Sequence, residues 1–115
     1  MMGEKVKSLL NGNVAILPAE GYVNESIADA IAVECERLMD DGVNNFILNM
    51  TQSRMINSVG IAIVVEIIEK ATQEGGSLVF CGVSPTIAKT FQIMGLLQLS
   101  SIFESEEDAL QAMPG

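Results

Sequence analysis

The sequence predicts an α/β fold in which about four helices pack against a mixed, mostly parallel β-sheet. Short apolar runs of strand length alternate with longer segments whose apolar residues recur every three or four positions. Glycine, proline and asparagine, which favour turns, separate these segments. Strands that alternate with helices in this way form parallel sheets that the helices cover.

The chain opens on a predicted β-hairpin. Residues 6–10 and 14–17 are two apolar runs, and the turn segment Asn11-Gly12-Asn13 lies between them. Asn-Gly tolerates the positive φ angles that tight hairpin turns require. We therefore expect one antiparallel pair at the start of the sheet, ahead of the strands that alternate with helices.

A first helix is predicted over residues 25–41. Asn24 is a good N-cap residue, and Gly42 closes the helix as a C-terminal glycine should. Apolar residues spaced by three and four positions place one side of this helix against the sheet. That side comprises Ile27, Ala30, Ile31, Cys35 and Leu38.

Two short apolar runs, residues 46–48 and 77–81, predict buried strands on either side of a second helix. A polar loop follows the first run, and the helix spans residues 58–74 before Gly75-Gly76 ends it. Its period separates two faces. The inward residues are Ile61, Val64, Val65 and Ile68, and the outward ones are Glu66, Glu69, Lys70 and Gln73.

Two helices and a brief strand complete the predicted fold. Pro85 opens the third helix, because proline is tolerated in a first turn, and Gly95 interrupts it. Residues 102–103 predict a strand, and Ser105 caps a last helix that runs through residue 113. No linker, repeat or low-complexity tract divides this β-β-α-β-α-β-α-β-α order, so we expect a single domain over residues 1–115.

The charge of the chain argues against nucleic acid as a partner. The formal net charge is −9, and the six basic residues are scattered along the sequence. No basic patch is therefore expected that could neutralise a run of phosphates. An acidic surface keeps the protein soluble and can steer it toward a basic protein partner.

The residue types also argue against an enzyme. The chain has no histidine, which excludes a Ser-His-Asp triad and a histidine-based zinc site. We expect no catalytic residue, cofactor or metal. Cys35 and Cys81 are expected to be buried, reduced thiols, as is usual in the cytosol. Because no signal peptide or membrane-length apolar stretch is recognisable, we expect a cytoplasmic protein without membrane insertion.

Residues 49–61 combine the end of a strand, a polar loop and the start of a helix. We expect Ser58 to be the N-cap, with its hydroxyl accepting from the backbone N–H of Gly60 or Ile61. Gly60 costs about 1 kcal/mol in a helix relative to alanine, and a close approach of another backbone or a ligand would explain it. A helix start carries partial positive charge, so it would accommodate a phosphate on Ser58. A plain capping serine is the alternative interpretation.

This segment resembles the core motif of the STAS family, named for sulfate transporters and anti-sigma factor antagonists, D-[LF]-S-x-x-x-x-[IM]-D-S-[ST]-G-[LIV]. The matching positions are Asn49-Met50-Thr51 and, four residues later, Ile56-Asn57-Ser58-Val59-Gly60-Ile61. Weaker likenesses to the family follow in residues 17–24, 78–85, 90–103 and 105–110. The resemblance thus covers essentially the whole chain and implies the STAS fold.

The resemblance implies a regulatory binding module of the anti-sigma factor antagonist type, with no catalysis of its own. In such families the serine that matches Ser58 is phosphorylated by a partner anti-sigma factor that is itself a serine kinase. The unphosphorylated form binds that kinase and so frees a sigma factor. The partner-binding residues that follow from the resemblance are Asn24, Thr51, Ser53, Arg54, Met55, Asn57, Ser58, Val59 and Gly60.

The chain departs from the family pattern at charged positions. Asn24, Asn49 and Asn57 stand where the family typically has aspartate, and Val59 replaces a second serine or threonine. Asparagine keeps the size and capping ability of aspartate but carries no charge. We therefore hypothesise that Ser58 is phosphorylated slowly or not at all. The chain would then be a constitutive STAS scaffold, or an accessory subunit of a larger sensory complex or a lipid-transport ATPase.

A third hypothesis is that a small ligand or nucleotide binds at the Ser58 helix start, because the helix dipole attracts anions. The segment 86–99 bears on assembly in a different way. Its period indicates a core-facing helix, and apolar residues left exposed there would favour assembly, including a homodimer. The apolar residues of this segment include Phe91, Ile93, Met94, Leu96 and Leu97.

Overall fold

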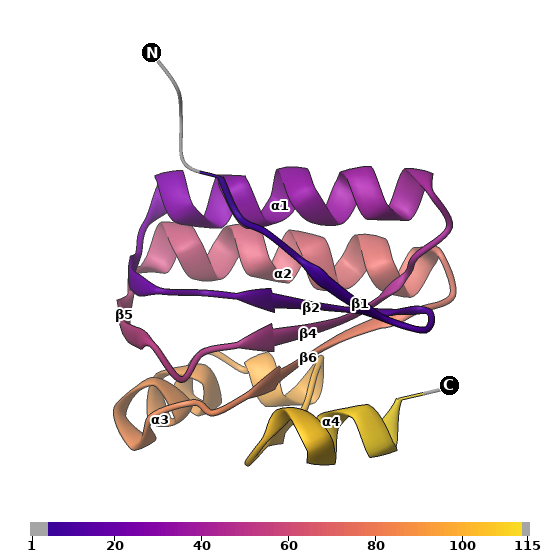
Figure 1. Ribbon diagram of the computed structural model, residues 1–115. Helices are drawn as coiled ribbons and strands as arrows, with labels where there is room; N and C mark the ends of the chain where they lie inside the picture. Colours follow the sequence, from indigo (N-terminus) through magenta and orange to yellow (C-terminus); the bar gives the residue numbers. More distant parts are fainter. Residues whose placement is uncertain (1–4, 114–115) are drawn as a thin grey trace.

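The computed structural model describes residues 5–113 and contains a five-stranded sheet, a two-stranded sheet and four α-helices (Figure 1). The larger sheet has the strand order β1 (Leu9–Asn11), β2 (Val14–Pro18), β4 (Asn45–Asn49), β6 (Ser77–Cys81) and β7 (Ile102–Phe103). The smaller sheet pairs β3 (Gly21–Val23) with β5 (Ser53–Ile56). The helices are α1 (Glu25–Asp40), α2 (Ser58–Gln73), α3 (Pro85–Ile93), the short 3₁₀ helix η1 (Leu96–Gln98) and α4 (Glu106–Ala112).

Strands β2, β4 and β6 form the parallel centre of the sheet, and β7 adds to it in parallel. Leu17 pairs with Leu48, which pairs with Phe80, and all three are at most 1% exposed. Side chains on such central strands are buried on both faces, so continuous apolar runs suit them. The predicted α/β class with a mixed, mostly parallel sheet and four helices is confirmed.

The two faces of the sheet carry separate apolar clusters. Leu17 and Phe46 belong to the larger cluster, which α1 and α2 cover. Ile16 and Ile47, which alternate with them, belong to a smaller cluster with α4. Figure 1 shows α1 and α2 side by side on one side of the strands and α4 on the other. A core on each side fixes the sheet between two layers of helix.

The first helix and the hairpin differ from prediction in their details. In α1, Ala28 is fully buried although it was not predicted on the inward side. Ile27 packs half-buried against the core as predicted, whereas Ala30 is half-buried and lines a groove beside Lys5. The hairpin turn is narrower than the predicted Asn11-Gly12-Asn13: it is Gly12-Asn13, because Asn11 already pairs with Val14. The first strand is Leu9–Asn11, not residues 6–10. Gly12 has φ 62°, the left-handed value that suits the first turn position of a type II′ hairpin.

Strands β3 and β5 were not predicted from the sequence. Residues 53–56 were expected in a polar loop, but they form β5, which pairs in parallel with β3. Each strand has three or four residues, too few for a clear alternation of apolar and polar side chains. Their pairing joins segments about thirty positions apart, so it depends on tertiary packing rather than on local sequence.

The cysteines agree with prediction: both are buried and free. Burial raises the pKa of the Cys35 thiol to about 12. Burial, with the nearby Glu106 carboxylate adding to it, raises the pKa of Cys81 to about 11. Both groups are therefore protonated and unreactive thiols at neutral pH. Within residues 5–113, none of the helices has the length and apolar character needed to span a bilayer.

Candidate functional site

The candidate site lies where the parallel strands end and α2 begins. β4 ends at Asn49, a turn leads into β5, and α2 starts at Ser58 directly after Asn57. In Figure 1, β5 and the starts of α1 and α2 lie at the same end of the molecule, toward which β2 and β4 point. Residues from β3, β5 and α2 thus meet at one edge of the fold, the position at which open α/β sheets bind their ligands.

The N-cap of α2 is Asn57, not Ser58 as predicted. The Asn57 Oδ1 accepts a hydrogen bond from the Gly60 N–H at 2.8 Å, and its backbone is extended. Asparagine caps as well as serine does, and it stands one position earlier. Ser58 is consequently the first helical residue and exposed, and its hydroxyl has no hydrogen-bond partner among residues 5–113. The hydroxyl is therefore free to react or to bind.

The start of α2 lacks acidic side chains, and two of its backbone amides have no acceptor among the described residues. No acidic residue lies in its first turn. Asn57 satisfies the amides of Gly60 and Ile61, whereas no described residue accepts from those of Ser58 and Val59. Unpaired amides and the helix dipole give this end a partial positive charge. The arrangement can accept negative charge on Ser58 without losing an existing interaction.

Gly60 holds the start of α2 against β3, which confirms the close approach predicted for it. A Cβ atom at this position would lie 2.6 Å from the backbone oxygen of Val23. The same oxygen accepts from the Asn57 N–H at 3.2 Å. A side chain at position 60 would push the two elements apart. The glycine thus brings the surface of β3 beside Ser58.

Three exposed apolar residues, Tyr22, Met55 and Val59, lie on the elements that meet at this end of the fold, and together they are called the apolar rim. The exposed fractions are 48%, 56% and 45%. Tyr22 and Met55 are neighbours in the β3–β5 pairing, and Val59 follows Ser58 directly. Aromatic residues and methionine are enriched at protein interfaces. Tyr22 was not among the predicted partner-binding residues, because its place on this surface depends on strand β3, which was not predicted.

The predicted partner-binding residues fall into three groups by exposure. Ser53 and Gly60 are buried, so they shape the surface and do not offer side chains to a partner. Asn24 and Asn57 are half-buried. The exposed members are Thr51, Arg54, Met55, Ser58 and Val59. Arg54 forms no ion pair within the described chain, so its charge is available at this surface.

The three asparagines at family aspartate positions all have structural roles. Asn24 caps α1 by accepting from the Ile27 N–H at 3.1 Å, and Asn57 caps α2. Asn49 accepts from the backbone N–H of Thr51 at 2.9 Å and so forms a turn after β4. An aspartate would cap both helices equally well. The fold therefore does not require the negative charge that an aspartate would carry at position 24 or 57.

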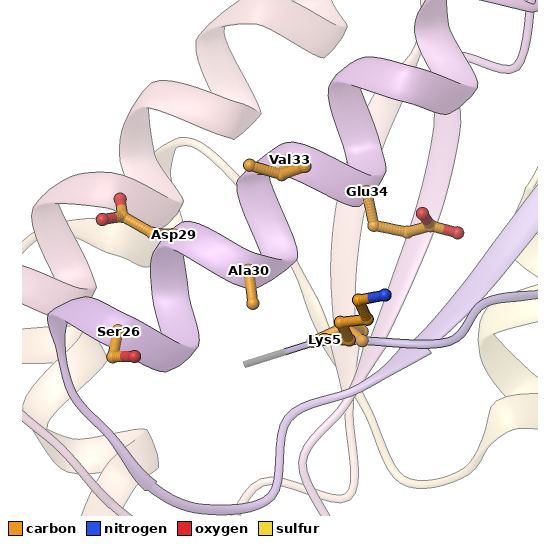
Figure 2. A pocket seen from close by; sticks show the side chains of 7 residues that line it. Lys5, Ser26, Asp29, Ala30, Val33 and Glu34 are labelled. Carbon is orange, nitrogen blue, oxygen red and sulfur yellow. The ribbon is translucent and has the colours of Figure 1, made fainter. Parts of the chain in front are cut away.

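Within residues 5–113, a metal-ligating cluster or a surface groove would be an alternative to this site. No group of metal-ligating side chains occurs within residues 5–113. A groove of about 440 Å³ lies between Lys5 and the outer face of α1 (Figure 2). Of its acidic residues, Glu34 is already bound to Arg37 and Ser8. The other polar residues that line the groove are Lys5, Ser26 and Asp29, and the Asp29 carboxylate points away from Lys5 (Figure 2).

These features define a small α/β domain with an exposed serine at an uncharged helix start and an apolar rim beside it. Residues 6–109 match the sequence profile of the STAS domain family. The chain belongs to the STAS family.

Similar proteins carry anti-sigma factor antagonist names. BtrV of Bordetella bronchiseptica, named as a candidate anti-sigma factor antagonist, is 28% identical over 93 residues, which cover 81% of this chain and 80% of BtrV. The crystal structure of TM1081 from Thermotoga maritima, described in the same terms, is similar with a TM-score of 0.86 at 16% identity, and the match covers 94% of this chain and 93% of TM1081.

The fold is also similar to that of SpoIIAA from Bacillus, an anti-sigma factor antagonist. The TM-score is 0.74 for its unphosphorylated form and 0.73 for its phosphorylated form, both at 18% identity. The two matches cover 92% of this chain and 94% and 96% of the SpoIIAA chains. At this identity the likeness establishes the shared STAS fold.

Proposed function

We propose that this chain is a regulatory binding module of the anti-sigma factor antagonist type, switched by phosphorylation at Ser58. Its unphosphorylated form binds a partner anti-sigma factor that is a serine kinase. The observation that carries the proposal is the exposed Ser58 hydroxyl, which has no hydrogen-bond partner among the described residues and lies at an α2 start without acidic residues. SpoIIAA, whose fold is similar, exists in phosphorylated and unphosphorylated forms. The chain acts as substrate and binder, and the partner supplies the catalysis.

The chemistry of the switch follows from the helix start. The Ser58 oxygen takes the γ-phosphoryl group of the kinase's ATP, ADP leaves, and the hydroxyl proton passes to a base on the kinase. The phosphate adds about −1.5 to −2 charges and three acceptor oxygens beside the free amides of Ser58 and Val59. The fold accommodates it, whereas a partner surface packed on the rim faces new charge that it must desolvate. Phosphorylation thus separates the complex.

The apolar rim supplies the binding energy of the unphosphorylated state. Truncation of a central aromatic interface residue costs about 2 kcal/mol or more. We expect Tyr22→Ala to weaken partner binding by more than about tenfold, which corresponds to about 1.4 kcal/mol. Val33→Ala is the control, because Val33 is an apolar residue that is 66% exposed but lies midway along α1, in the groove beside Lys5. Equal losses for both variants would contradict a localised surface.

The direct test is the intact mass of the protein isolated from its own cells. We expect one added phosphate in the natural chain and in a Ser101→Ala variant, whose exposed serine serves as control, and none in Ser58→Ala. Ser58→Ala should retain the kinase in a pull-down, and Ser58→Asp should release it. Absence of phosphate under every growth condition would reject the switch. If Ser58 is phosphorylated, Asn57→Asp tests whether the negative charge that the family carries at this position matters. Faster phosphorylation of this variant would show that asparagine slows the kinase.

A second candidate function is that of a constitutive subunit in a larger sensory or transport assembly. Four apolar residues at the end of α3 and around η1 are strongly exposed, although their helical period predicted a core position for this segment. Only Ile87, Phe91 and Leu96 reach the core there. The exposed residues, Ile93, Met94, Leu97 and Leu99, are exposed to 74%, 53%, 42% and 51%. Such a patch favours assembly with another surface.

The mass of the native assembly in solution distinguishes the two candidate functions. A stable homo-oligomer or a co-purifying subunit that is lost in Ile93→Ser, while Ser58→Ala has no effect, would favour the constitutive subunit. A monomer whose only partner responds to Ser58→Asp would favour the switch. The first proposal is preferred because it accounts for both the rim and the open helix start.

A further inference from the structure

Asn49 connects the end of β4 with both α4 and the turn that leads to β5. Its Nδ2 donates to Oε2 of Glu106, the first residue of α4, at 2.5 Å. Its Oδ1 accepts from the backbone N–H of Thr51 at 2.9 Å and from the Thr51 hydroxyl at 2.7 Å. One amide side chain thus links residues 57 positions apart in sequence. It does so at the turn that leads into β5. We call Ser58 and the apolar rim together the Ser58 surface.

With glutamate at position 106, the chemistry of the neighbours favours an asparagine at position 49. The backbone N–H of Thr51 can only donate, and an ionised Glu106 can only accept. The amide must therefore turn its oxygen toward Thr51 and its nitrogen toward Glu106. An aspartate has no donor when it is ionised, and it would place a second negative oxygen against Glu106. The amide of Asn49 is therefore matched to the carboxylate of Glu106, and an aspartate at position 49 would need an amide donor at position 106.

The turn held by Asn49 packs tightly against the elements beside it. The Thr51 methyl group occupies the space over Gly82, where an added Cβ would lie 2.2 Å from it. On the other side, the Gln52 backbone oxygen accepts from the Gly21 N–H at 2.9 Å, at the start of β3. A shift of this turn therefore moves β3 and β5, the strands that carry Tyr22 and Met55.

We propose that Glu106 is a positioning residue for the Ser58 surface, acting through Asn49 on the Thr51 turn. Glu106 orients the Asn49 amide, which fixes Thr51 and, through the turn, the placement of the apolar rim. The part of this inference that concerns partner binding rests on the proposed function. The part that concerns the turn does not, and it can be tested in the isolated chain.

A set of four proteins tests the pair, with amide hydrogen exchange of Thr51, followed by NMR, as the readout. Asn49→Asp should speed exchange by at least about tenfold, because a broken hydrogen bond and two facing carboxylates open the turn. Glu106→Gln should leave exchange unchanged, since its amide oxygen still accepts from Asn49. The double variant should restore protection, because the introduced glutamine nitrogen then donates to the introduced carboxylate, in the reversed sense.

Glu107→Gln is the matched control. Glu107 lies in the same first turn of α4 but is exposed and forms no side-chain hydrogen bond within residues 5–113. Combined with Asn49→Asp, it should not restore protection. Rescue by Glu107→Gln as well as Glu106→Gln would reduce the effect to general charge and overturn the proposal. So would Thr51 protection that persists in Asn49→Asp alone. If Asn49→Asp does not fold, folding of the Glu106→Gln double variant, but not the Glu107→Gln one, supports the pair.

Partner binding gives the second readout. With a cognate kinase in hand, Asn49→Asp should bind at least about tenfold more weakly, and the Glu106→Gln double variant should bind like the natural chain. Equal binding of all variants, with Thr51 exchange changed as expected, would reject the role of Glu106 in docking. Failure of the natural chain to bind any kinase rejects the proposed function, and the exchange result then stands by itself.

Discussion

The starts of α2 and α4 have the same kind of cap but opposite electrostatics. Asn57 caps α2 with a bond to the Gly60 N–H, and Ser105 caps α4 with a bond to the Asp108 N–H at 3.1 Å. The first turn of α2 has no acidic residue, whereas that of α4 has three, one of which is bound to Asn49. Carboxylates already offset the positive end of α4. The difference shows which helix start can still gain from negative charge.

The largest expected effect is at Gly60, which is specific to α2. Gly60→Ala introduces a Cβ 2.6 Å from the Val23 oxygen, so β3 and α2 must move apart. Such overpacking lowers the free energy of unfolding by about 1–3 kcal/mol, although alanine has the higher helix propensity. Urea unfolding measures this change. Ser58→Ala, at an exposed position in the same turn, is the control; a Gly60→Ala protein as stable as that control would contradict the tight contact.

Loss of a cap should come next in size. Asn57→Ala removes the acceptor for the Gly60 N–H and should lower the unfolding free energy by about 1 kcal/mol. Asn57→Ser keeps an acceptor and should cost little. Ser105→Ala at α4 should cost less than Asn57→Ala, because three carboxylates still stabilise that helix start. Thermal unfolding compares the three variants, and an equal loss at both caps would remove the contrast between the helices.

A change of one negative charge should have a smaller effect: adding it at the start of α2 should stabilise the fold, and removing it at the start of α4 should destabilise it. Ser58→Asp and Ser58→Asn differ mainly in charge, and we expect the aspartate to be more stable by about 0.3–1 kcal/mol. At α4, Glu107→Gln should be destabilising by a similar amount. Both differences should shrink in 1 M salt, where the Debye length is about 3 Å. A more stable Ser58→Asn would mean that the start of α2 is not open to negative charge.

The smallest effect concerns Glu34, away from both helix starts. The hydrogen bond from Arg37 holds the pKa of Glu34 below its ordinary value of 4.5. A lowered pKa in the folded state means that this stabilisation is present above pH 4.5 and is lost as the pH falls further. Melting temperatures between pH 7 and 3 should therefore fall more steeply for the natural chain than for Glu34→Gln. Parallel curves would show that the pair does not contribute.

Local sequence was sufficient for the helices and for the order of the main strands. Asn24, Ser105 and Pro85 mark helix starts where predicted, and Gly42 and Gly95 have the positive φ angles that end or interrupt helices. These signals act over one turn of helix, so they do not depend on the rest of the fold. Even the packing role of Gly60 followed from its cost within a helix.

Tertiary structure decided the details of the candidate site. Asn57 caps α2 in place of Ser58 because β5 ends at Ile56 and Asn57, with extended backbone, follows it directly. β5 itself depends on pairing with β3. The same pairing exposes Tyr22 beside Met55. The contact between Asn49 and Glu106 joins the first half of the chain to the last helix. Periodicity and capping are local, whereas strand pairing and cross-chain hydrogen bonds arise only when distant segments pack.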